Sequence, residues 1–426
     1  MTQSYQQSGS SFYGLGIAPK ILEALGRMEF TAPTPIQYKA IPIATEGKDV
    51  IGVAQTGTGK TLAFAIPIIQ HLAQGKGKCL VLVPTRELAI QVDETFQKIA
   101  SLFGIKTVVL IGGASMHLQL QTLRRNPRVI IATPGRLVDH MSQRTVLLAD
   151  VNTLVLDEAD RMLDMGFLPQ IEQILKYIPK NRQTMLFSAT IPSEVVKIAT
   201  SHMKLPVNIE IAPSGTTAER VIQELFIVRK DTKRKLLEKL LGQYKGSVLL
   251  FSRTKIGATK ITHYLRKMGY RAAEIHSNRS LSQRREALEG FKTGKYRVLV
   301  ATDIAARGID VTGIELVINY DLPEDAENYV HRIGRTARAG HEGRAISFAT
   351  PEQGLEVRNI EKLIKTALPV SEHPEIPKEN FIQQYNRPPD RRFGGGQKSR
   401  QGTWHKHAGS YPKRRNTSSY KIHRRP

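Results

Sequence analysis

The chain has 426 residues, 40% of them hydrophobic, which provides enough apolar material for two ordinary domains plus extensions. Lys and Arg outnumber Asp and Glu by 62 to 38, and the formal charge of +24 favours a nucleic-acid partner over a merely solvated basic surface. The single Cys79 excludes an internal disulfide, and no secretory signal or bilayer-length apolar run is present, so we expect a cytoplasmic protein without membrane contact.

Short apolar runs alternate with longer helical patterns in the first half, which is typical of an α/β domain around a parallel sheet. Each run ends in polar or glycine-rich residues, where such sheets bind ligands. A pattern at 61–73 predicts an apolar helix after the first strand. We expect this domain to span residues 1–208. Its predicted strands lie at 49–54, 78–85, 106–113, 128–136, 152–160 and 184–190.

Pro, Gly and two Thr interrupt this rhythm and predict a linker at 209–220. A second α/β domain is expected over 221–372, and a disordered basic tail over 373–426. From Arg387 onward the tail has 12 Lys or Arg against one acidic residue, and its Trp404 is available for stacking on bases. A merely solubilising tail is the alternative. The strands predicted for the second domain lie at 222–229, 247–254, 271–277, 297–303, 315–321 and 343–350.

The stretch GVAQTGTGKTLAF after the first predicted strand nearly matches a phosphate-binding loop, with Ala54 where the general pattern has Gly. Gly57 and Gly59 allow the backbone to wrap a phosphate. Lys60 would reach the β- and γ-phosphates, and the hydroxyl of Thr61 would ligate Mg²⁺. By itself, the stretch could also be a glycine-rich loop with a chance lysine.

The segment LVLDEAD ends another predicted strand in acidic residues. Asp157 would hold Mg²⁺ largely through water, and Glu158 would orient or deprotonate an attacking water. Acidic residues here could instead cap a helix, but together with Lys60 they favour a site that hydrolyses ATP. HRIGRTAR places Arg335 and Arg338 three residues apart, on one helical face, where they could stabilise developing charge.

These motifs belong to an ordered series, PTPIQ, AQTGTGKT, PTRELA, GG, TPGR, DEAD, SAT, ARGID and HRIGRTAR. Over roughly residues 12–370 the chain resembles the DEAD-box family of ATP-dependent RNA helicases, in which Ala at the first loop position is usual. The resemblance implies two tandem RecA-like domains, each a parallel sheet flanked by helices, with ATP and RNA in the cleft between them. It also implies ATP-driven unwinding of RNA duplexes or remodelling of RNA–protein complexes, in ribosome assembly or RNA decay.

The resemblance assigns nucleotide and coupling roles at motif positions. Gln37 should read adenine, with Phe12 near the base and Asp310 near the ribose. Ser188 and Thr190 should hydrogen-bond toward Asp160 and couple hydrolysis to unwinding. Arg335 and Arg338 should be arginine fingers, and His331 an interdomain contact, for which a satisfied core histidine is the alternative. The nucleotide set is Phe12, Gln37, Thr56, Gly57, Thr58, Gly59, Lys60, Thr61 and Asp310.

Contacts to RNA are expected along its backbone, because Gly allows close approach of backbone amides to phosphates. The alternative for PTRELA and TPGR is ordinary strand-to-helix turn chemistry, in which the polar residues are helix caps. The expected RNA contacts are Pro84, Thr85, Arg86, Gly112, Gly113, Thr133, Gly135 and Arg136 from the first domain and Thr254, Arg284 and Thr302 from the second.

The chain departs from the family pattern at four positions. In HSNRSLSQRR, Ser277 replaces a Gly and Leu281 replaces the Gln of Gln-x-x-Arg, which puts the contact made by that Gln in doubt. Glu29 and Ala337 replace common glycines, and both should be tolerable on a surface or a helix. The HSNRSLSQRREALEGFK pattern and the basic tail look most like bacterial RhlE-type members.

Two other functions remain open from the sequence. The first is an RNA-binding scaffold, which the tail supports and the complete set of hydrolytic residues disfavours. The second is a DNA translocase, since backbone contacts alone do not distinguish ribose from deoxyribose. We expect a monomeric core, with ribosomal or RNA-decay proteins as candidate partners.

Overall fold

The computed structural model describes residues 11–55, 57–211, 221–306, 314–336 and 343–382, and it determines each of two α/β domains by itself. The first contains a seven-stranded sheet of order β3-β4-β2-β5-β6-β1-β7, in which every neighbouring pair is parallel. Its strands are β1 (Val50–Val53), β2 (Lys78–Leu82), β3 (Thr107–Leu110), β4 (Val129–Ala132), β5 (Val151–Asp157), β6 (Gln183–Ser188) and β7 (Val207–Glu210).

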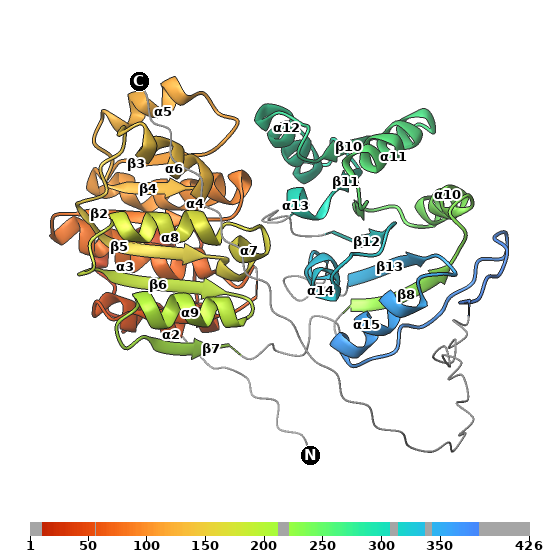
Figure 1. Ribbon diagram of the computed structural model, residues 1–426, viewed down its shortest axis with the longest axis horizontal. Helices are drawn as coiled ribbons and strands as arrows, with labels where there is room; N and C mark the ends of the chain where they lie inside the picture. The colour runs from red at the N-terminus through yellow and green to blue at the C-terminus, as the bar shows by residue number, and fades with distance from the viewer. Residues whose placement is uncertain (1–10, 56, 212–220, 307–313, 337–342, 383–426) are drawn as a thin grey trace, which may run out of the picture. The chain divides into compact units, whose positions relative to one another are not determined.

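Helices cover both faces of this sheet and form a separate apolar core on each (Figure 1). One core packs α2, α3 and α4 against the sheet, and the other packs α6, α8 and α9. The helices are α1 (Pro19–Arg27), α2 (Pro35–Thr45), α3 (Lys60–Gln74), α4 (Arg86–Ala100), α5 (Met116–Leu123), α6 (Pro134–Ser142), α7 (Ala159–Asp164), α8 (Leu168–Tyr177) and α9 (Ser193–His202).

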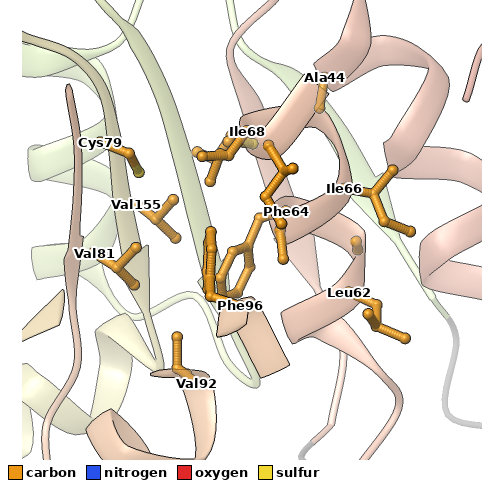
Figure 2. Packing of buried hydrophobic residues seen from close by; sticks show 14 of the residues in the cluster. Ala44, Leu62, Phe64, Ile66, Ile68, Cys79, Val81, Val92, Phe96 and Val155 are labelled. Carbon is orange, nitrogen blue, oxygen red and sulfur yellow. The ribbon is translucent and has the colours of Figure 1, made fainter. Parts of the chain in front are cut away.

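The helix that follows the phosphate loop is fixed by aromatic packing. Figure 2 shows Phe64 of α3 against Phe96 of α4, with ring centroids 6.1 Å apart, and Phe187 of β6 lies 5.4 Å from Phe64. All three side chains are fully buried. Each such side chain contributes roughly 1.5–3 kcal/mol on burial, so the start of α3 is held firmly against the sheet. Cys79 is buried in the same core, and burial raises the pKa of its thiol.

Strand β7 shows where the predicted boundary of the first domain differs from the structure. The prediction began the linker at residue 209, but β7 continues to Glu210 and pairs with β1, with Val50 opposite Val207. This strand lies at the edge of the sheet and buries only Ile209 among its four residues. An edge strand has no continuous apolar run, so the sequence pattern did not reveal it.

The second domain contains a six-stranded parallel sheet of order β10-β11-β9-β12-β13-β8, with cores on both faces. Its six strands match the six predicted runs: β8 (Val221–Ile227), β9 (Val248–Phe251), β10 (Ala272–Ile275), β11 (Val298–Ala301), β12 (Leu316–Asn319) and β13 (Gly343–Ala349). Its helices are α10 (Lys233–Gln243), α11 (Lys255–Lys267), α12 (Leu281–Lys292), α13 (Asp303–Ala306), α14 (Ala326–Ile333) and α15 (Gly354–Ile364).

Residues 373–382, which the prediction assigned to the tail, pack on the second domain. The segment leading into them covers the open edge of β8, where Leu225 donates to the carbonyl of Pro369 and accepts from the amide of Ser371, both at 2.8 Å. Phe381 then packs against Gly354 at the start of α15. An unpaired sheet edge needs such a cover, which short-range patterns do not show. No helix within the described ranges has the length and apolar character needed to cross a membrane.

Candidate nucleotide and nucleic-acid site

The strand order of the first sheet sorts the motif loops into two neighbouring groups. In a parallel sheet the carboxyl ends of all strands lie along one edge of the sheet. The loops that follow the strands are therefore arranged along this edge in the order of the strands. GG, TPGR and PTRELA follow β3, β4 and β2, while DEAD, SAT and the phosphate loop follow β5, β6 and β1. The predicted RNA contacts therefore lie along one half of the edge and the predicted nucleotide contacts along the other.

The phosphate loop has the backbone conformation that its glycines allow. Gly57 and Gly59 have φ of +82° and +87°, in the left-handed region that favours glycine. Lys60 is the first residue of α3, and its Nζ donates to the carbonyl of Ala54 at 2.9 Å across the loop. The hydroxyl of Thr58 donates to the carbonyl of Gln55 at 2.7 Å. The positive end of α3 and a buried ammonium thus converge on one loop, which suits an anion.

Gln37 lies against this loop and has two backbone partners. Its Oε1 accepts from the amide of Thr34 at 2.9 Å, which forms a capping box at the start of α2. Its Nε2 donates to the carbonyl of Gly59 at 3.0 Å, and a Cβ on Gly59 would lie 2.3 Å from that nitrogen. Gln37 therefore supports the phosphate loop itself. Phe12, predicted near the base, is buried in the apolar core of the domain.

The acidic motif places two carboxylates of different electrostatic character at the end of β5. Burial raises the pKa of Asp157 to about 6, which Lys60 opposes and Glu158 reinforces. Burial acts on Glu158 too, but Arg161 and then Lys60 hold the pKa of Glu158 below its ordinary value. The Arg161 Nη1 lies 2.5 Å from the Glu158 Oε2, and both side chains are buried. Arg161 was not predicted, although it lies one helical turn after Glu158.

Asp160 joins the ends of β5 and β6. Its Oδ2 accepts from the amide of Thr190 at 2.8 Å, from the Thr190 hydroxyl at 3.0 Å and from the amide of Ala189 at 3.0 Å. The amide of Asp160 in turn donates to the Ser188 hydroxyl at 3.2 Å. Burial opposes ionisation, but the hydrogen bond from the Thr190 amide, with Lys60 next, holds the pKa of Asp160 below its ordinary value. The DEAD and SAT segments thus form one hydrogen-bonded unit.

The predicted RNA contacts of the first domain lie together. The guanidinium of Arg86 lies against the glycine pair, since a Cβ on Gly113 would be 2.3 Å from its Nη1. Gly113 has φ of +77°. Arg136 donates from Nη1 to the carbonyl of Ala114 at 3.2 Å. Pro84 precedes α4, whose N-cap Thr85 accepts from the Leu88 amide at 3.2 Å, and Thr133 and Gly135 lie at the start of α6. Thr85 therefore caps α4, as the alternative interpretation of PTRELA expected.

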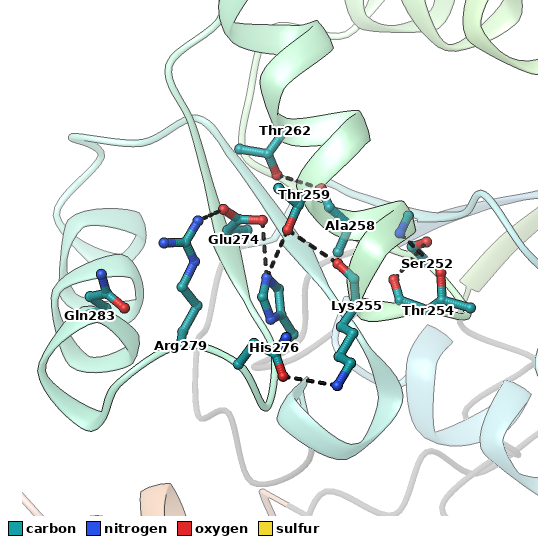
Figure 3. A network of polar contacts seen from close by, with 12 residues as sticks. Ser252, Thr254, Lys255, Ala258, Thr259, Thr262, Glu274, His276, Arg279 and Gln283 are labelled. Atoms are coloured by element: carbon teal, nitrogen blue, oxygen red, sulfur yellow. Dashed lines mark hydrogen bonds and ion pairs between the residues drawn. The ribbon is translucent and has the colours of Figure 1, made fainter.

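Figure 3 shows the polar network around HSNRS, the segment of the second domain that differs from the family pattern. The Nε2 of His276 lies 3.1 Å from both the Thr259 hydroxyl and the Glu274 carboxylate, and Glu274 also pairs with Arg279. Lys255 donates to the Asn278 side chain at 3.0 Å, next to Ser277. The predicted RNA contact Thr254 caps α11, accepting from the Gly257 amide at 3.0 Å.

The start of α12 shows what has become of the Gln-x-x-Arg motif. Ser280 is the N-cap and forms a capping box with Gln283. Leu281 and Arg284 lie in the first turn that follows. The side-chain amide of Gln283 thus accepts from the backbone of Ser280. Leu281, at the position of the family's Gln, has no polar group in its side chain. Thr302, the remaining predicted contact, lies directly before α13.

Arg332 is a buried residue that the sequence did not single out. It forms two bonds to the carboxylate of Asp303, at 2.5 and 2.7 Å, and donates to the carbonyl of Asp321 at 2.6 Å. Its guanidinium lies 4.9 Å from the ring centroid of Phe251. These contacts fix α14 on the sheet and so position His331, in its last turn, and Arg335, just after it. The sequence shows several arginines here without showing which one is the anchor.

Several predicted residues lie outside the described part of the chain. They are Thr56, Asp310, Arg338, Ala337, most of the linker and the tail with Trp404. Among the described departures, Glu29 is exposed but has φ of +62°, the region in which the family's glycine is favoured. The expectation of a tolerable surface position therefore misses a backbone cost at Glu29.

Comparison with known proteins found two matching domain families and many related helicases. Residues 34–198 match the DEAD/DEAH box helicase family and residues 232–340 match the helicase conserved C-terminal domain. The chain is 42% identical to the ATP-dependent rRNA helicase RRP3 of Meyerozyma guilliermondii, over 87% of this chain and 78% of that protein. It is 44% identical to the ATP-dependent RNA helicase CshA of Listeria monocytogenes, over 84% of this chain and 69% of that protein.

A solved structure gives the same result for the fold. The chain is 29% identical to S. cerevisiae Dbp5 bound to RNA and ADP BeF3, with a TM-score of 0.76, covering 85% of this chain and 96% of that one. The expectation of two RecA-like domains with parallel sheets is thereby confirmed.

Proposed function

The chain belongs to the DEAD-box family of ATP-dependent RNA helicases, and from this premise we propose which of its residues bind ATP, Mg²⁺ and RNA. It is an enzyme that binds RNA and couples ATP hydrolysis to RNA unwinding or remodelling. The observation that carries the proposal is the division of one sheet edge into a nucleotide half and an RNA half, adjacent at β2 and β5.

At the nucleotide half, the phosphate loop and Lys60 bind the β- and γ-phosphates, with Gln37 supporting the loop. Three buried carboxylates, Asp157, Glu158 and Asp160, lie in one turn, and the raised pKa of Asp157 is what a site prepared for a cation would show without one. Glu158 and Asp160 are engaged with Arg161 and Thr190, so the oxygen donors that suit Mg²⁺ are the Asp157 carboxylate and the Thr61 hydroxyl. The ion would neutralise phosphate charge, held by Asp157 and Thr61 largely through water.

Glu158 orients or deprotonates the attacking water. For this role it must be ionised, and the buried ion pair with Arg161 keeps it so. Asp160, bonded to Thr190 and Ser188, transmits changes at the acidic motif to β6 and beyond. From the second domain, Arg335 and Arg338 stabilise the charge that develops on the transferred phosphoryl group, and Asp310 contacts the ribose.

At the RNA half, Arg86, Arg136 and the amides around Gly112 and Gly113 bind consecutive phosphates. Thr254, Arg284 and Thr302 supply contacts from the second domain. ATP and RNA that each contact both domains would favour a closed arrangement, in which an intact duplex no longer fits. His331 contributes to the interface that forms on closure.

We also propose a biological setting and protein partners for this helicase. The relatives named as rRNA helicases support a substrate in ribosome assembly, with ribosomal or RNA-decay proteins as partners. The RhlE-type assignment, the monomeric core and the cytoplasmic location, which a single buried thiol suits, remain predictions.

Replacing Glu158 tests the hydrolytic assignment. Glu158→Gln should lower RNA-stimulated ATP turnover by about 100-fold or more while ATP binding stays intact, because the amide keeps the shape and loses the charge. Glu172→Gln, at an exposed position on α8, is the matched control. Turnover near the unmodified level in Glu158→Gln would remove that residue from the chemistry. Stimulation measured with RNA and DNA strands of one sequence distinguishes the helicase from a DNA translocase, and duplex unwinding distinguishes it from a scaffold.

A further inference from the structure

Gln119 is a polar residue buried behind the glycine pair. It is 5% exposed and is the buried residue of α5, whose other seven residues are partly or fully exposed. Buried glutamines are costly unless their amide groups are hydrogen-bonded. None of the nucleotide or RNA roles proposed above involves this side chain.

The amide of Gln119 bonds to the backbone on both sides of Gly112 and Gly113. Its Oε1 accepts from the amide of Ile111 at 3.2 Å, and its Nε2 donates to the carbonyl of Ile111 at 3.1 Å and to that of Ala114 at 3.3 Å. A backbone amide can only donate, so the atom that faces Ile111 N must be the oxygen. This fixes the orientation of the side-chain amide.

His140 links the same oxygen to the helix that carries TPGR. This residue of α6 is fully buried, and its Nε2 lies 3.3 Å from Gln119 Oε1. Because Oε1 is an acceptor, Nε2 must carry the proton. The Nδ1 lies 2.8 Å from the Thr145 hydroxyl, whose one proton also has the carbonyl of His140 within reach at 3.0 Å, and a neutral ring accepts that proton at Nδ1 when the hydroxyl turns toward it. One tautomer therefore connects α5, α6 and the glycine pair.

The location of this network gives it a function. Two consecutive glycines form the most flexible backbone available, so their conformation must be imposed by neighbours. Arg86 lies against Gly113 and Arg136 donates to the carbonyl of Ala114, while the buried Gln119 holds the segment through Ile111 and the same Ala114 carbonyl. A leucine at 119 would fill similar space but would leave the amide and carbonyl of Ile111 unpaired.

We propose that Gln119 and His140 are positioning residues for RNA, which hold the glycine pair and the start of α6 at the spacing that consecutive phosphates of one strand require. This inference rests on the proposed RNA contacts at Gly112, Gly113 and Arg136. The network lies in the RNA half of the sheet edge, so it acts on RNA affinity and leaves the nucleotide half unchanged.

RNA titration of ATPase activity tests the proposal with four variants of the full chain. Gln119→Leu and His140→Phe should each raise the RNA concentration for half-maximal stimulation by about fivefold to tenfold, the effect of one or two lost hydrogen bonds. The maximal rate, the KM for ATP and the RNA-independent rate should not change. The double variant should be little worse than either single one, because both break one network. His140→Gln, which keeps an N–H donor near Nε2, should restore most of the affinity.

Gln183→Leu is the matched control for loss of stability. Gln183 is also buried and donates to two backbone carbonyls, those of Ala44 and Lys48, both at 2.8 Å. It lies at the start of β6, at the opposite edge of the sheet from the motif loops. Its loss should lower the midpoint of urea unfolding as much as Gln119→Leu does, without changing RNA half-saturation.

The outcomes separate this inference from the proposed function. If Gln119→Leu and His140→Phe change RNA half-saturation no more than Gln183→Leu does, the positioning role is wrong. The same conclusion holds if His140→Gln is as weak as His140→Phe. Arg136→Ala tests the underlying contact: unchanged RNA half-saturation in that variant overturns the proposed RNA site itself. If Gln119→Leu does not fold, the comparison of His140→Phe with His140→Gln decides.

Discussion

The two domains share one strand order but differ at the position that binds nucleotide in the first. In each domain the first strand leads to a helix that begins with a buried lysine, Lys60 of α3 or Lys233 of α10. In each, an aspartate lies at the carboxyl end of the strand two places along the sheet from that first strand: Asp157 is the last residue of β5, and Asp321 lies two residues after β12. The lysines and aspartates thus belong to corresponding strands and helices of two similar sheets, although the aspartates differ by one position in register.

Their partners are different. The Nζ of Lys233 donates to the carbonyl of Tyr320 at 2.6 Å and lies 3.1 Å from the Asp321 carboxylate. The connection before Lys233, residues 228–232, has no glycine, whereas the loop before Lys60 turns at Gly57 and Gly59. The strand topology by itself therefore does not make a phosphate site. The glycines that open a loop, and a lysine directed across that loop, do.

Other features of the plan are common to both domains. Arg128 precedes β4 and donates to the carbonyls of Leu72, Gly75 and Gly77 at the end of α3. Arg297 precedes β11 and donates to the carbonyls of Leu241, Tyr244 and Gly246 at the end of α10. A cation at a helix C-terminus satisfies carbonyls that have no partner within the helix. The scaffold is repeated while the ligand-binding loop is not.

Replacing each of the two lysines by methionine should reveal the largest difference between the domains. Lys60→Met should lower RNA-stimulated ATPase by about 100-fold or more, because a preorganised charge on the phosphates is lost. Lys233→Met should keep the rate within about twofold and lower the free energy of unfolding of the second domain by roughly 1–3 kcal/mol, since a buried charge pair is broken. Steady-state ATPase and urea unfolding measure both. Equal losses of activity would contradict the assignment of the site to one domain.

Replacing each of the two aspartates by asparagine should change stability in opposite directions at pH 7.5. The pKa of Asp157 is raised to about 6 in the folded chain, against about 3.9 when unfolded. Its protonated form favours folding below about pH 4, and this stabilisation is lost as pH rises through 6. At pH 7.5, without Mg²⁺ or nucleotide, Asp157→Asn should thus increase the free energy of unfolding by roughly 1–3 kcal/mol, with little effect at pH 4. ATPase activity should be lost.

Asp321→Asn is the control for this pH effect. Asp321 accepts from Lys233 and from the amide of Arg253 at 3.1 Å, so its replacement should destabilise the second domain at pH 7.5. Urea unfolding at the two pH values gives both results. A stabilisation by Asp157→Asn of the same size at pH 4 and pH 7.5 would show that ionisation of this carboxyl is not its cause.

Two helix ends give the smallest and most local comparison. Helix α1 has Met28 as its C-cap and turns at Glu29 with φ of +62°, and α11 has Met268 as its C-cap and turns at Gly269 with φ of +84°. Each turn is closed by the same two hydrogen bonds, including Phe30 N to Leu25 O and Tyr270 N to Leu265 O, both at 3.0 Å.

Glycine at the first of these turns should relieve a backbone cost. Glu29→Gly should stabilise the first domain by roughly 0.5–1 kcal/mol, and Gly269→Ala should destabilise the second by a similar amount. Thermal or urea unfolding measures the two shifts. A loss of stability in Glu29→Gly would mean that the glutamate side chain makes a compensating contribution.

Much of the fold and of the candidate site followed from the sequence, because the signals are local. The phosphate loop is a strand, two glycines and an apolar helix in direct succession, and the structure has them at β1, Gly57, Gly59 and α3. The six runs of the second domain became its six strands, since buried parallel strands are continuously apolar. The apolar run before DEAD likewise predicted a buried strand that ends in the acidic residues, and β5 ends at Asp157.

Tertiary structure alone decided which polar residues hold the motifs in place. Arg332 is an anchor because Asp303 and Asp321, from other strands' ends, converge on it. Gln119 and His140 meet from two helices, β7 is recognised only by its pairing with β1, and residues 373–382 only by their packing on the second domain. Spacing along the chain carries no information about such contacts, because their strength depends on distance and burial in the folded chain.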